Sequence, residues 1–275
     1  MSLLKWIAFT LVGIVSVYAV ESDAELGNWC GTVATEEWLA ADYARAPSAK
    51  RQVVGQPSIT VDTYFHVVTN STRVQDGWLT DQLLNDQLQI LNADYASSNI
   101  SFRLQGISRT VNAAWATNGN TRVQLEMHKA LREGAYDTLN IYFRTHIRSE
   151  TGNTVNGYCT LPFTFQQGSE NFYRDGCVVF HSTVPGRTVT HEVGHWFGLL
   201  HTFQGGCTGP GDNVMDTPAE ALPSWDCNIT RDTCPDQPGY DPVRNFMDYS
   251  TGSCRNNFTP GQIARMWGQW NYFRA

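Results

Sequence analysis

The two halves of the chain differ in the pattern of their hydrophobic positions. Residues 59–68 read Ile-Thr-Val-Asp-Thr-Tyr-Phe-His-Val-Val, and their β-branched and aromatic side chains predict a strand. Residues 79–97 repeat apolar side chains at helical spacing, which predicts an amphipathic helix capped by Thr80 or Asp81. Residues 204–253 show no such period and are rich in Gly, Pro, Asp and Cys, so they are expected to form loops.

The same criteria predict the remaining elements. Strands are expected at residues 100–111, 138–143, 155–161 and 176–182. Helices are expected at residues 122–132, 188–200 and 259–273. Thr188 or Thr190 would open the second of these helices, and Thr259 would cap the third with Pro260 at its first position. His66 lies within the first strand and is interpreted as a packed residue, not as a ligand.

The helix predicted at residues 188–200 contains the most specific motif of the chain. Residues 191–201 read His-Glu-Val-Gly-His-Trp-Phe-Gly-Leu-Leu-His, which is HExxHxxGxxH. On a helix, His191 and His195 lie on one face, so both imidazoles can reach one metal ion. The alternative is a helix with surface histidines and a solvated glutamate. Such a helix would not require the five defined residues of this motif at their exact spacing.

The end of the motif supplies the rest of a metal site. Gly198 can take a positive φ and end the helix, which would let His201 swing back as a third ligand. Three protein ligands leave a fourth position open for water, the arrangement of a catalytic zinc site. Glu192 is adjacent to the first ligand and is placed to hold the water rather than the metal.

A second segment extends the motif into a family resemblance. Residues 245–250 read Asn-Phe-Met-Asp-Tyr-Ser, and this segment resembles the Met-turn of the metzincin metalloproteases. The chain is similar to the pappalysin branch of the metzincins, especially the small secreted fungal extracellular metalloproteases. The similarity covers most of the chain and includes residues 157–159, 176–181, 211–218 and 257–262.

This resemblance implies the fold. We expect an α+β metzincin-type zincin with two subdomains around a cleft. The upper one would hold a twisted mixed β-sheet with backing and active-site helices. The lower one would be loop-rich, stapled by disulfides and closed by a C-terminal helix. The zinc would lie at the floor of the cleft.

The resemblance also implies the activity. We expect a secreted zinc-dependent endopeptidase with one catalytic Zn²⁺, which hydrolyses peptide bonds of extracellular proteins with a metal-activated water. Glu192 would act as the general base and return the proton to the leaving amine. Met247 would lie beneath the zinc, and Tyr249 would stabilise the oxyanion or ligate the zinc while the site is empty.

Two other functions remain open. The first is a catalytically silent zinc-binding metzincin scaffold that acts as a binding module, although all the motif residues are present. The second is a zinc hydrolase of non-peptide amides. Only the family resemblance favours peptide substrates over this alternative.

Composition and charge restrict the partners. A chain of 275 residues with 41% hydrophobic residues can form one large core or two subdomains around a cleft. The formal net charge of -7 argues against nucleic acid, because no basic stripe could displace counterions from phosphates. The expected partners are protein or peptide substrates, and a monomer is the default because the sequence carries no oligomer signal.

The N-terminal residues have the pattern of a secretory signal peptide. Residues 1–19 contain a charged start, a short apolar run and small residues at the usual cleavage positions. The run is too short for a comfortable membrane span, so secretion is expected. Residues 20–51 would be a pro-segment and residues 52–275 the catalytic domain, because Lys50-Arg51 is a dibasic processing site in a small, polar stretch. A solvated charge pair is the alternative.

Seven cysteines fit an oxidising compartment. Cys159 and Cys177 flank a predicted loop between two strands and could pair. In the resembling family the four later cysteines pair first with third and second with fourth, which implies the bridges Cys207–Cys234 and Cys227–Cys254. The sequence by itself allows three pairings of these four.

Cys30 is left over, in the segment Trp29-Cys30-Gly31-Thr32. A thiolate could fill the open zinc position and exclude the water, and the resemblance implies such a latency device in the pro-segment. A free thiol or an intermolecular disulfide is the alternative.

Two segments bear on the substrate. Residues 176–181 are expected to form the sheet edge over the cleft, where an extended peptide can add main-chain hydrogen bonds. In metzincins the wall of the main side-chain pocket follows the Met-turn, and here residues 250–253 read Ser-Thr-Gly-Ser. No acidic group is present, so medium apolar or mixed side chains are expected rather than Arg or Lys.

Further sites are expected on the surface. Asp212 and Asp216 lie in a loop that binds calcium in the resembling family, and an Asx-rich turn without an ion is the alternative. In a secreted protein, glycans are expected at the Asn-x-Ser/Thr positions Asn70, Asn99, Asn228 and Asn257.

Overall fold

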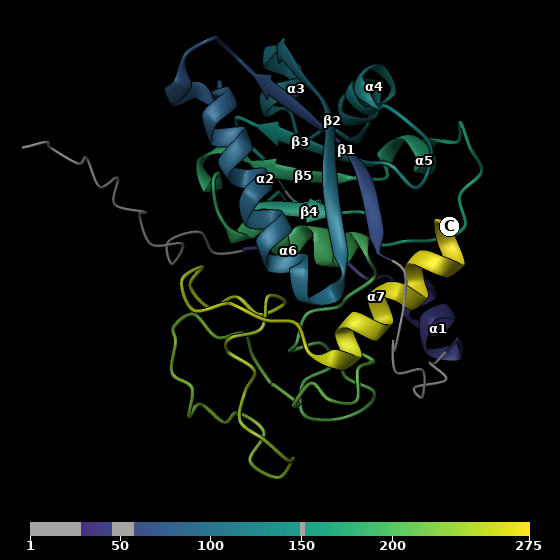
Figure 1. Ribbon diagram of the computed structural model, residues 1–275, viewed down its shortest axis with the longest axis vertical. Helices are drawn as coiled ribbons and strands as arrows, with labels where there is room; N and C mark the ends of the chain where they lie inside the picture. Colours follow the sequence, from purple (N-terminus) through teal and green to yellow (C-terminus); the bar gives the residue numbers. More distant parts are fainter. Residues whose placement is uncertain (1–28, 46–57, 149–151) are drawn as a thin grey trace, which may run out of the picture.

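A five-stranded mixed sheet forms the upper half of the molecule (Figure 1). The computed structural model describes residues 29–45, 58–148 and 152–275. The strands are β1 (Ile59–Thr69), β2 (Ile100–Val111), β3 (Leu139–Arg144), β4 (Gly157–Cys159) and β5 (Cys177–Phe180). They lie in the order β2-β1-β3-β5-β4, and β4 alone runs antiparallel to its neighbour.

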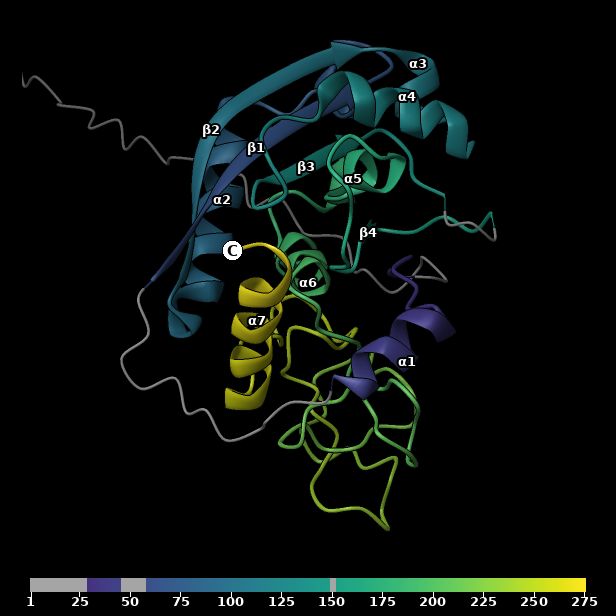
Figure 2. The same ribbon diagram turned by 90° about the vertical axis from the view of Figure 1, so that its right-hand side faces the viewer.

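The two faces of the sheet bury different sets of side chains. Alternate residues of β1, such as Phe65 and Val67, pack against α2 (Asp81–Tyr95) and α6 (Arg187–Trp196). On the opposite face, residues such as Val68 and Tyr142 pack against α3 (Ala113–Thr117) and α4 (Thr121–Leu131) (Figure 2). Because side chains alternate along a strand, each helix layer covers one set of positions.

The order of the strands corrects one expectation about the substrate edge. Residues 176–181 were expected at the edge of the sheet, but β5 lies inside it, between β3 and β4. The edge next to α6 is β4. A hydrophobic pattern identifies a strand without specifying its neighbours, so the sequence could not distinguish the two positions.

The start of α6 is set by another helix rather than by its own sequence. The helix begins at Arg187, with Gly186 as its N-cap and no side-chain cap, so the prediction that Thr188 or Thr190 opens it was wrong. The side chain of Gln87 on α2 instead accepts a hydrogen bond from Gly186 N (2.8 Å) and donates one to Gly186 O (3.0 Å). Through these two bonds, a residue 99 positions earlier in the chain holds the main chain in place where α6 begins.

The lower half consists mainly of loops and confirms the expected two-part α+β architecture. Disulfides Cys207–Cys234 and Cys227–Cys254 cross-link these loops, and Cys159–Cys177 joins β4 to β5. The C-terminal helix α7 (Pro260–Phe273) begins with a capping box formed by Thr259 and Gln262.

Three short α-helices among the described residues were not predicted from the pattern. The helix α1 (Glu36–Ala44) packs near α7 and the lower loops, and α5 (Glu170–Arg174) precedes β5 (Figures 1 and 2). Five-residue α3 also escaped prediction, because so short a helix carries too few residues for a periodic signal. No helix within the described ranges is long and apolar enough to cross a membrane.

A buried ionic cluster ties the C-terminus to α6. Asp175 accepts hydrogen bonds from Arg274 (2.9 Å) and from the Trp196 indole (3.2 Å). The Arg274 guanidinium also lies 3.6 Å from the centre of the Trp196 ring. Both charged side chains are buried, and Arg132, also buried, lies 3.5 Å from the same carboxylate, so the loss of Arg274 would leave Asp175 with one longer ion pair.

Replacing Arg274 with Ala should therefore destabilise the fold by about 3–5 kcal/mol, because the Asp175 charge would stay buried without this partner. The free energy of unfolding in denaturant measures the effect. Arg122→Ala is the matched control, since Arg122 is 87% exposed in its pair with Glu126, and it should cost no more than about 0.5 kcal/mol. Equal losses for the two variants would contradict the assignment.

Candidate metal centre

Three histidines converge on one point at the end of α6. His191 and His195 lie one turn apart on the helix, and the chain then reverses at Gly198, where φ is +84°. This turn brings His201 back toward them. His195 Nε2 lies 3.2 Å from His191 Nε2 and 3.1 Å from His201 Nε2. The positive φ and the nearby Gln269 side chain leave room only for glycine at position 198.

The hydrogen bonds of two of these rings determine where their protons lie. His191 Nδ1 is 2.7 Å from the Phe246 carbonyl oxygen, and His195 Nδ1 is 2.8 Å from that of Leu199. A carbonyl oxygen only accepts hydrogen bonds, so each Nδ1 must carry the proton. In the neutral rings, both Nε2 atoms therefore present lone pairs to each other, an arrangement that a shared cation stabilises.

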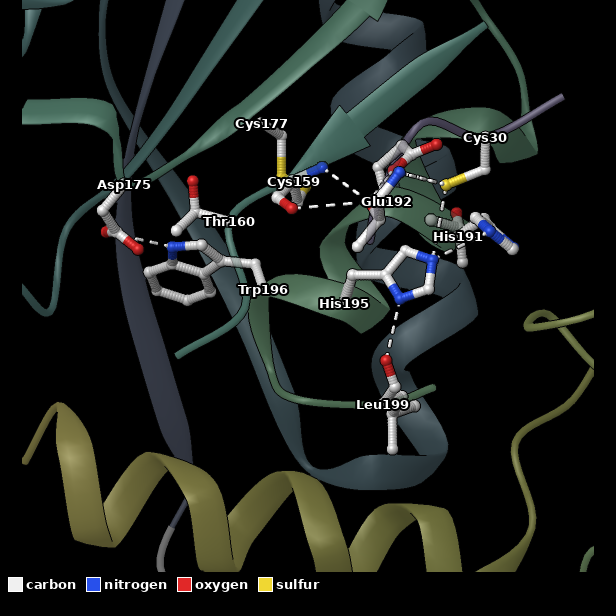
Figure 3. Close-up of a disulfide and its surroundings, with 12 residues drawn as sticks. Cys30, Cys159, Thr160, Asp175, Cys177, His191, Glu192, His195, Trp196 and Leu199 are labelled. Carbon is white, nitrogen blue, oxygen red and sulfur yellow. Dashed lines mark hydrogen bonds between the residues drawn. A yellow bond between two sulfur atoms is a disulfide. The ribbon is translucent and has the colours of Figure 1, made fainter. Parts of the chain in front are cut away.

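Cys30 supplies a fourth atom to the cluster (Figure 3). Its Sγ lies 3.5 Å from His195 Nε2, and the four ligand atoms all lie within 4.8 Å of one another. Tetrahedral zinc with nitrogen and sulfur bonds of about 2.0–2.3 Å separates its ligand atoms by about 3.3–3.6 Å. The geometry and the chemistry of the four donors thus fit a zinc ion.

Burial keeps the three imidazoles neutral, which is the form that binds a metal. It lowers the pKa of His195 to about 4. It also lowers the pKa of His191 and of His201 well below the usual value, and neighbouring imidazoles add to both shifts. Burial and the Glu192 carboxylate raise the pKa of Cys30 well above its usual value, so a cation is needed to favour the thiolate.

Glu192 lies beside the cluster without belonging to it. Its Oε2 accepts hydrogen bonds from Cys30 Sγ (3.4 Å) and from the Thr32 hydroxyl (3.3 Å), while Oε1 has no protein partner within the described ranges. Burial raises the pKa of this carboxyl to about 8. A carboxylate in this position can exchange protons with a molecule that replaces the thiol.

Met247 and Tyr249, in the segment expected to form a Met-turn, both lie against the end of α6 or the histidines. Met247 is fully buried, and its Sδ contacts α6 so closely at Gly194 that a Cβ there would lie 2.4 Å from the sulfur. The Tyr249 hydroxyl lies 3.1 Å from His201 Nε2. The turn therefore supports the helix from below and brings a phenol to the donor cluster.

Two buried residues of the segment that contains Cys30 carry no sequence motif and were not predicted. Trp29, next to Cys30, is fully buried against His191, Tyr249 and Arg255. Asp42 on α1 is also buried, although it is an acidic residue on a short helix. The signal that could have found Trp29 is its position beside the unpaired cysteine. No local signal distinguishes Asp42 from a surface residue.

The expected calcium ligands do not form a cluster with the histidines. Asp216 accepts hydrogen bonds from the Thr259 hydroxyl (2.7 Å) and Gly261 N (2.8 Å), so it caps the start of α7. Asp212 is buried, and burial raises its pKa to about 7. Calcium binding therefore stays a prediction, as does glycosylation at the four exposed asparagines Asn70, Asn99, Asn228 and Asn257.

The sequence is similar to known metalloproteases. It matches the Peptidase_M43 family, described as pregnancy-associated plasma protein-A, over residues 129–271. An extracellular metalloprotease of Colletotrichum graminicola is 50% identical over 227 residues, which cover 79% of this chain and 78% of that protein. Extracellular metalloprotease 1 of Coccidioides posadasii is 44% identical over 257 residues, which cover 90% of each protein.

Two solved structures from Tannerella forsythia resemble this one. Mature mirolysin in complex with a cleaved peptide has a TM-score of 0.61 and 26% identity, with 77% of this chain and 91% of that chain covered. A promirolysin mutant has a TM-score of 0.69 and 25% identity, with 89% and 94% covered. The match to the pro-form extends over the larger share of this chain.

Replacing His195 with Ala should abolish stoichiometric metal binding, because His195 Nε2 contacts both other imidazoles. Zinc affinity should fall by at least about 100-fold, as measured by competition with a chromogenic chelator. His181→Ala is the control, since His181 lies outside the cluster. If the His195 variant kept the zinc content of the unmodified chain, the metal would have to be held elsewhere.

Proposed function

The chain belongs to the Peptidase_M43 family, and on that premise we propose that it is a secreted zinc endopeptidase that cleaves proteins outside the cell. The family and its relatives support a metalloprotease. The names of the relatives support an extracellular location, in line with the signal-peptide pattern of residues 1–19, which lie outside the described residues. The observation that carries the proposal is the convergence of three imidazole Nε2 atoms beside the buried Glu192 carboxylate.

The chain's own residues divide the chemistry between them. His191, His195 and His201 would hold a zinc ion, which would supply a Lewis acid to lower the pKa of water and to polarise the scissile carbonyl. Glu192 takes a proton from the attacking water and passes it to the leaving amine. The Tyr249 hydroxyl, close to His201, donates a hydrogen bond to the oxyanion that develops on the carbonyl.

The edge strand β4 supplies the main-chain contacts for a substrate. In the structure this edge binds the segment around Cys30, since Asn156 N donates to Trp29 O (2.9 Å) and Gly31 N donates to Gly157 O (2.8 Å). An extended peptide can form such bonds whatever its side chains are. We infer that a substrate uses the same edge after this segment has left.

We propose that the segment around Cys30 keeps the enzyme latent. Its thiol takes the fourth corner of the donor cluster, and the Thr32 hydroxyl contacts Glu192, so both reactive positions are covered. The larger coverage of the match to promirolysin supports a pro-segment here. Cleavage near Lys50-Arg51, which lies outside the described residues, would release it.

Helix α1 provides a second attachment for this pro-segment. Asp42 accepts hydrogen bonds from Arg265 (2.7 Å), Asn213 (2.9 Å) and Gln269 (3.0 Å), which belong to α7 and to the lower loops. The Trp38 indole also donates to Pro162 O (2.9 Å). Because the thiol and the helix are held separately, release requires both attachments to open.

Replacing Glu192 with Gln should lower the turnover of casein by the processed enzyme about 10²–10⁴-fold, because the amide cannot take up the proton. Zinc content should not change, since Glu192 is not among the donor atoms. Glu133→Gln, at an exposed position, should keep full activity. Bound zinc without chelator-sensitive cleavage in the unmodified enzyme would instead favour a silent binding module.

Replacing Asp42 with Asn should raise the residual activity of the unprocessed chain at least about tenfold, because a buried charge pair with Arg265 is lost. The measurement uses a chain with Lys50 and Arg51 changed to Ala, so that processing does not contribute. Glu37→Gln is the control on the same helix, because Glu37 is exposed. If both variants behaved like the parent, α1 would have no part in latency.

A further inference from the structure

The side chain of Trp29 fills a pocket next to the donor cluster. The residue is 0% exposed, and its ring centre lies 4.6 Å from that of His191, nearly at right angles to it. The ring of Tyr249 is 5.1 Å away. Since Cys30 follows directly, Trp29 is the side chain that the pro-segment inserts beside the metal position.

A buried arginine lies against the inserted ring. The guanidinium carbon of Arg255 is 4.3 Å from the centre of the Trp29 ring, a distance that allows a cation–π interaction. Arg255 is 1% exposed. It follows Cys254 of the Cys227–Cys254 disulfide, and its main-chain N donates to Thr251 O (3.3 Å). The wall that follows the Met-turn therefore contains a positive charge, which the sequence of residues 250–253 did not indicate.

The pocket walls belong to the catalytic domain. His191 lies on α6, Tyr249 on the Met-turn and Arg255 on the disulfide-linked segment. The main chain of Trp29 is bonded to the sheet edge, where we also place the substrate. A substrate side chain on this edge can therefore enter the same pocket once the pro-segment has left.

A buried carboxyl group also lies within electrostatic reach of Arg255. Asp248 is fully buried. Burial raises the pKa of Asp248, and hydrogen bonds from the main chain together with the charges of Arg255 and Arg231 oppose this shift. An acidic substrate side chain would bring a second negative charge near the buried Asp248, and a basic one would meet the guanidinium. A neutral aromatic ring gains the stacking contact without either cost.

We propose that the pocket filled by Trp29 is the principal side-chain subsite of the active enzyme, and that Arg255 makes it select Trp, Tyr or Phe in the substrate. This proposal rests on the proposed peptidase function. It replaces the expectation of medium apolar or mixed side chains with a defined class of residue and a defined contact.

The first test uses the unmodified, processed enzyme and a library of peptides derived from whole-cell protein, with cut sites identified by mass spectrometry. Aromatic residues should be enriched about tenfold at one of the two positions that flank the cut bond. Cleavage without this enrichment, or with a preference for acidic, basic or small side chains, overturns the subsite. If no peptide is cut in a chelator-sensitive way, the proposed function itself fails.

The second test examines Arg255 with two matched peptides that differ only by Trp or Leu at the selected position. Arg255→Met should reduce the ratio of their kcat/KM values about tenfold, because it removes the cation and keeps most of the volume. Arg255→Lys should retain part of the ratio, and Arg244→Met at an exposed position should retain all of it. The ratio is informative even if the Arg255 variants lose overall rate. An unchanged ratio in Arg255→Met overturns the role of Arg255. If that variant does not fold, the peptide library still tests the subsite independently.

Discussion

Three imidazole nitrogens that point at each other in a buried space are the constraint on which the rest of this structure depends. Carbonyl oxygens at Phe246 and Leu199 hold the protons on the far side of two rings, so their lone pairs meet near 3.2 Å. Neutral rings in this arrangement repel one another. A cation bound between the rings removes the repulsion. The proposed catalytic centre and its proposed inhibition by Cys30 both depend on binding at this one position.

The surrounding fold serves to keep these rings in place. Arg265 of α7 donates to the Gly198 carbonyl (2.8 Å), at the turn that returns His201 to the cluster. The same arginine bonds Asp42 of α1. One side chain therefore contacts both the turn that returns His201 and the helix α1. The two halves of the molecule meet at α6, which contacts the sheet above and Met247 below.

The sequence predicted the features that depend on local spacing. The convergence of the motif histidines, the cap at Thr80 and the strand positions all follow from residues close together in the chain, and so does the α+β fold class. The rest depends on partners far apart. Gln87 bonds Gly186, the N-cap residue of α6, from 99 residues away, and Asp42 bonds residues 171, 223 and 227 positions later. Trp29 and Arg255 belong to opposite ends of the chain, so no pattern reveals their contact.

The central claim is that one metal ion is held by three histidines and, before processing, by Cys30. X-ray absorption at the zinc edge tests it most directly on the secreted chain before and after removal of the pro-segment. The account predicts one sulfur ligand at about 2.3 Å with nitrogen ligands at about 2.0 Å before processing, and no sulfur afterwards. Zinc without a sulfur ligand in the unprocessed chain, or with sulfur retained after processing, would contradict it.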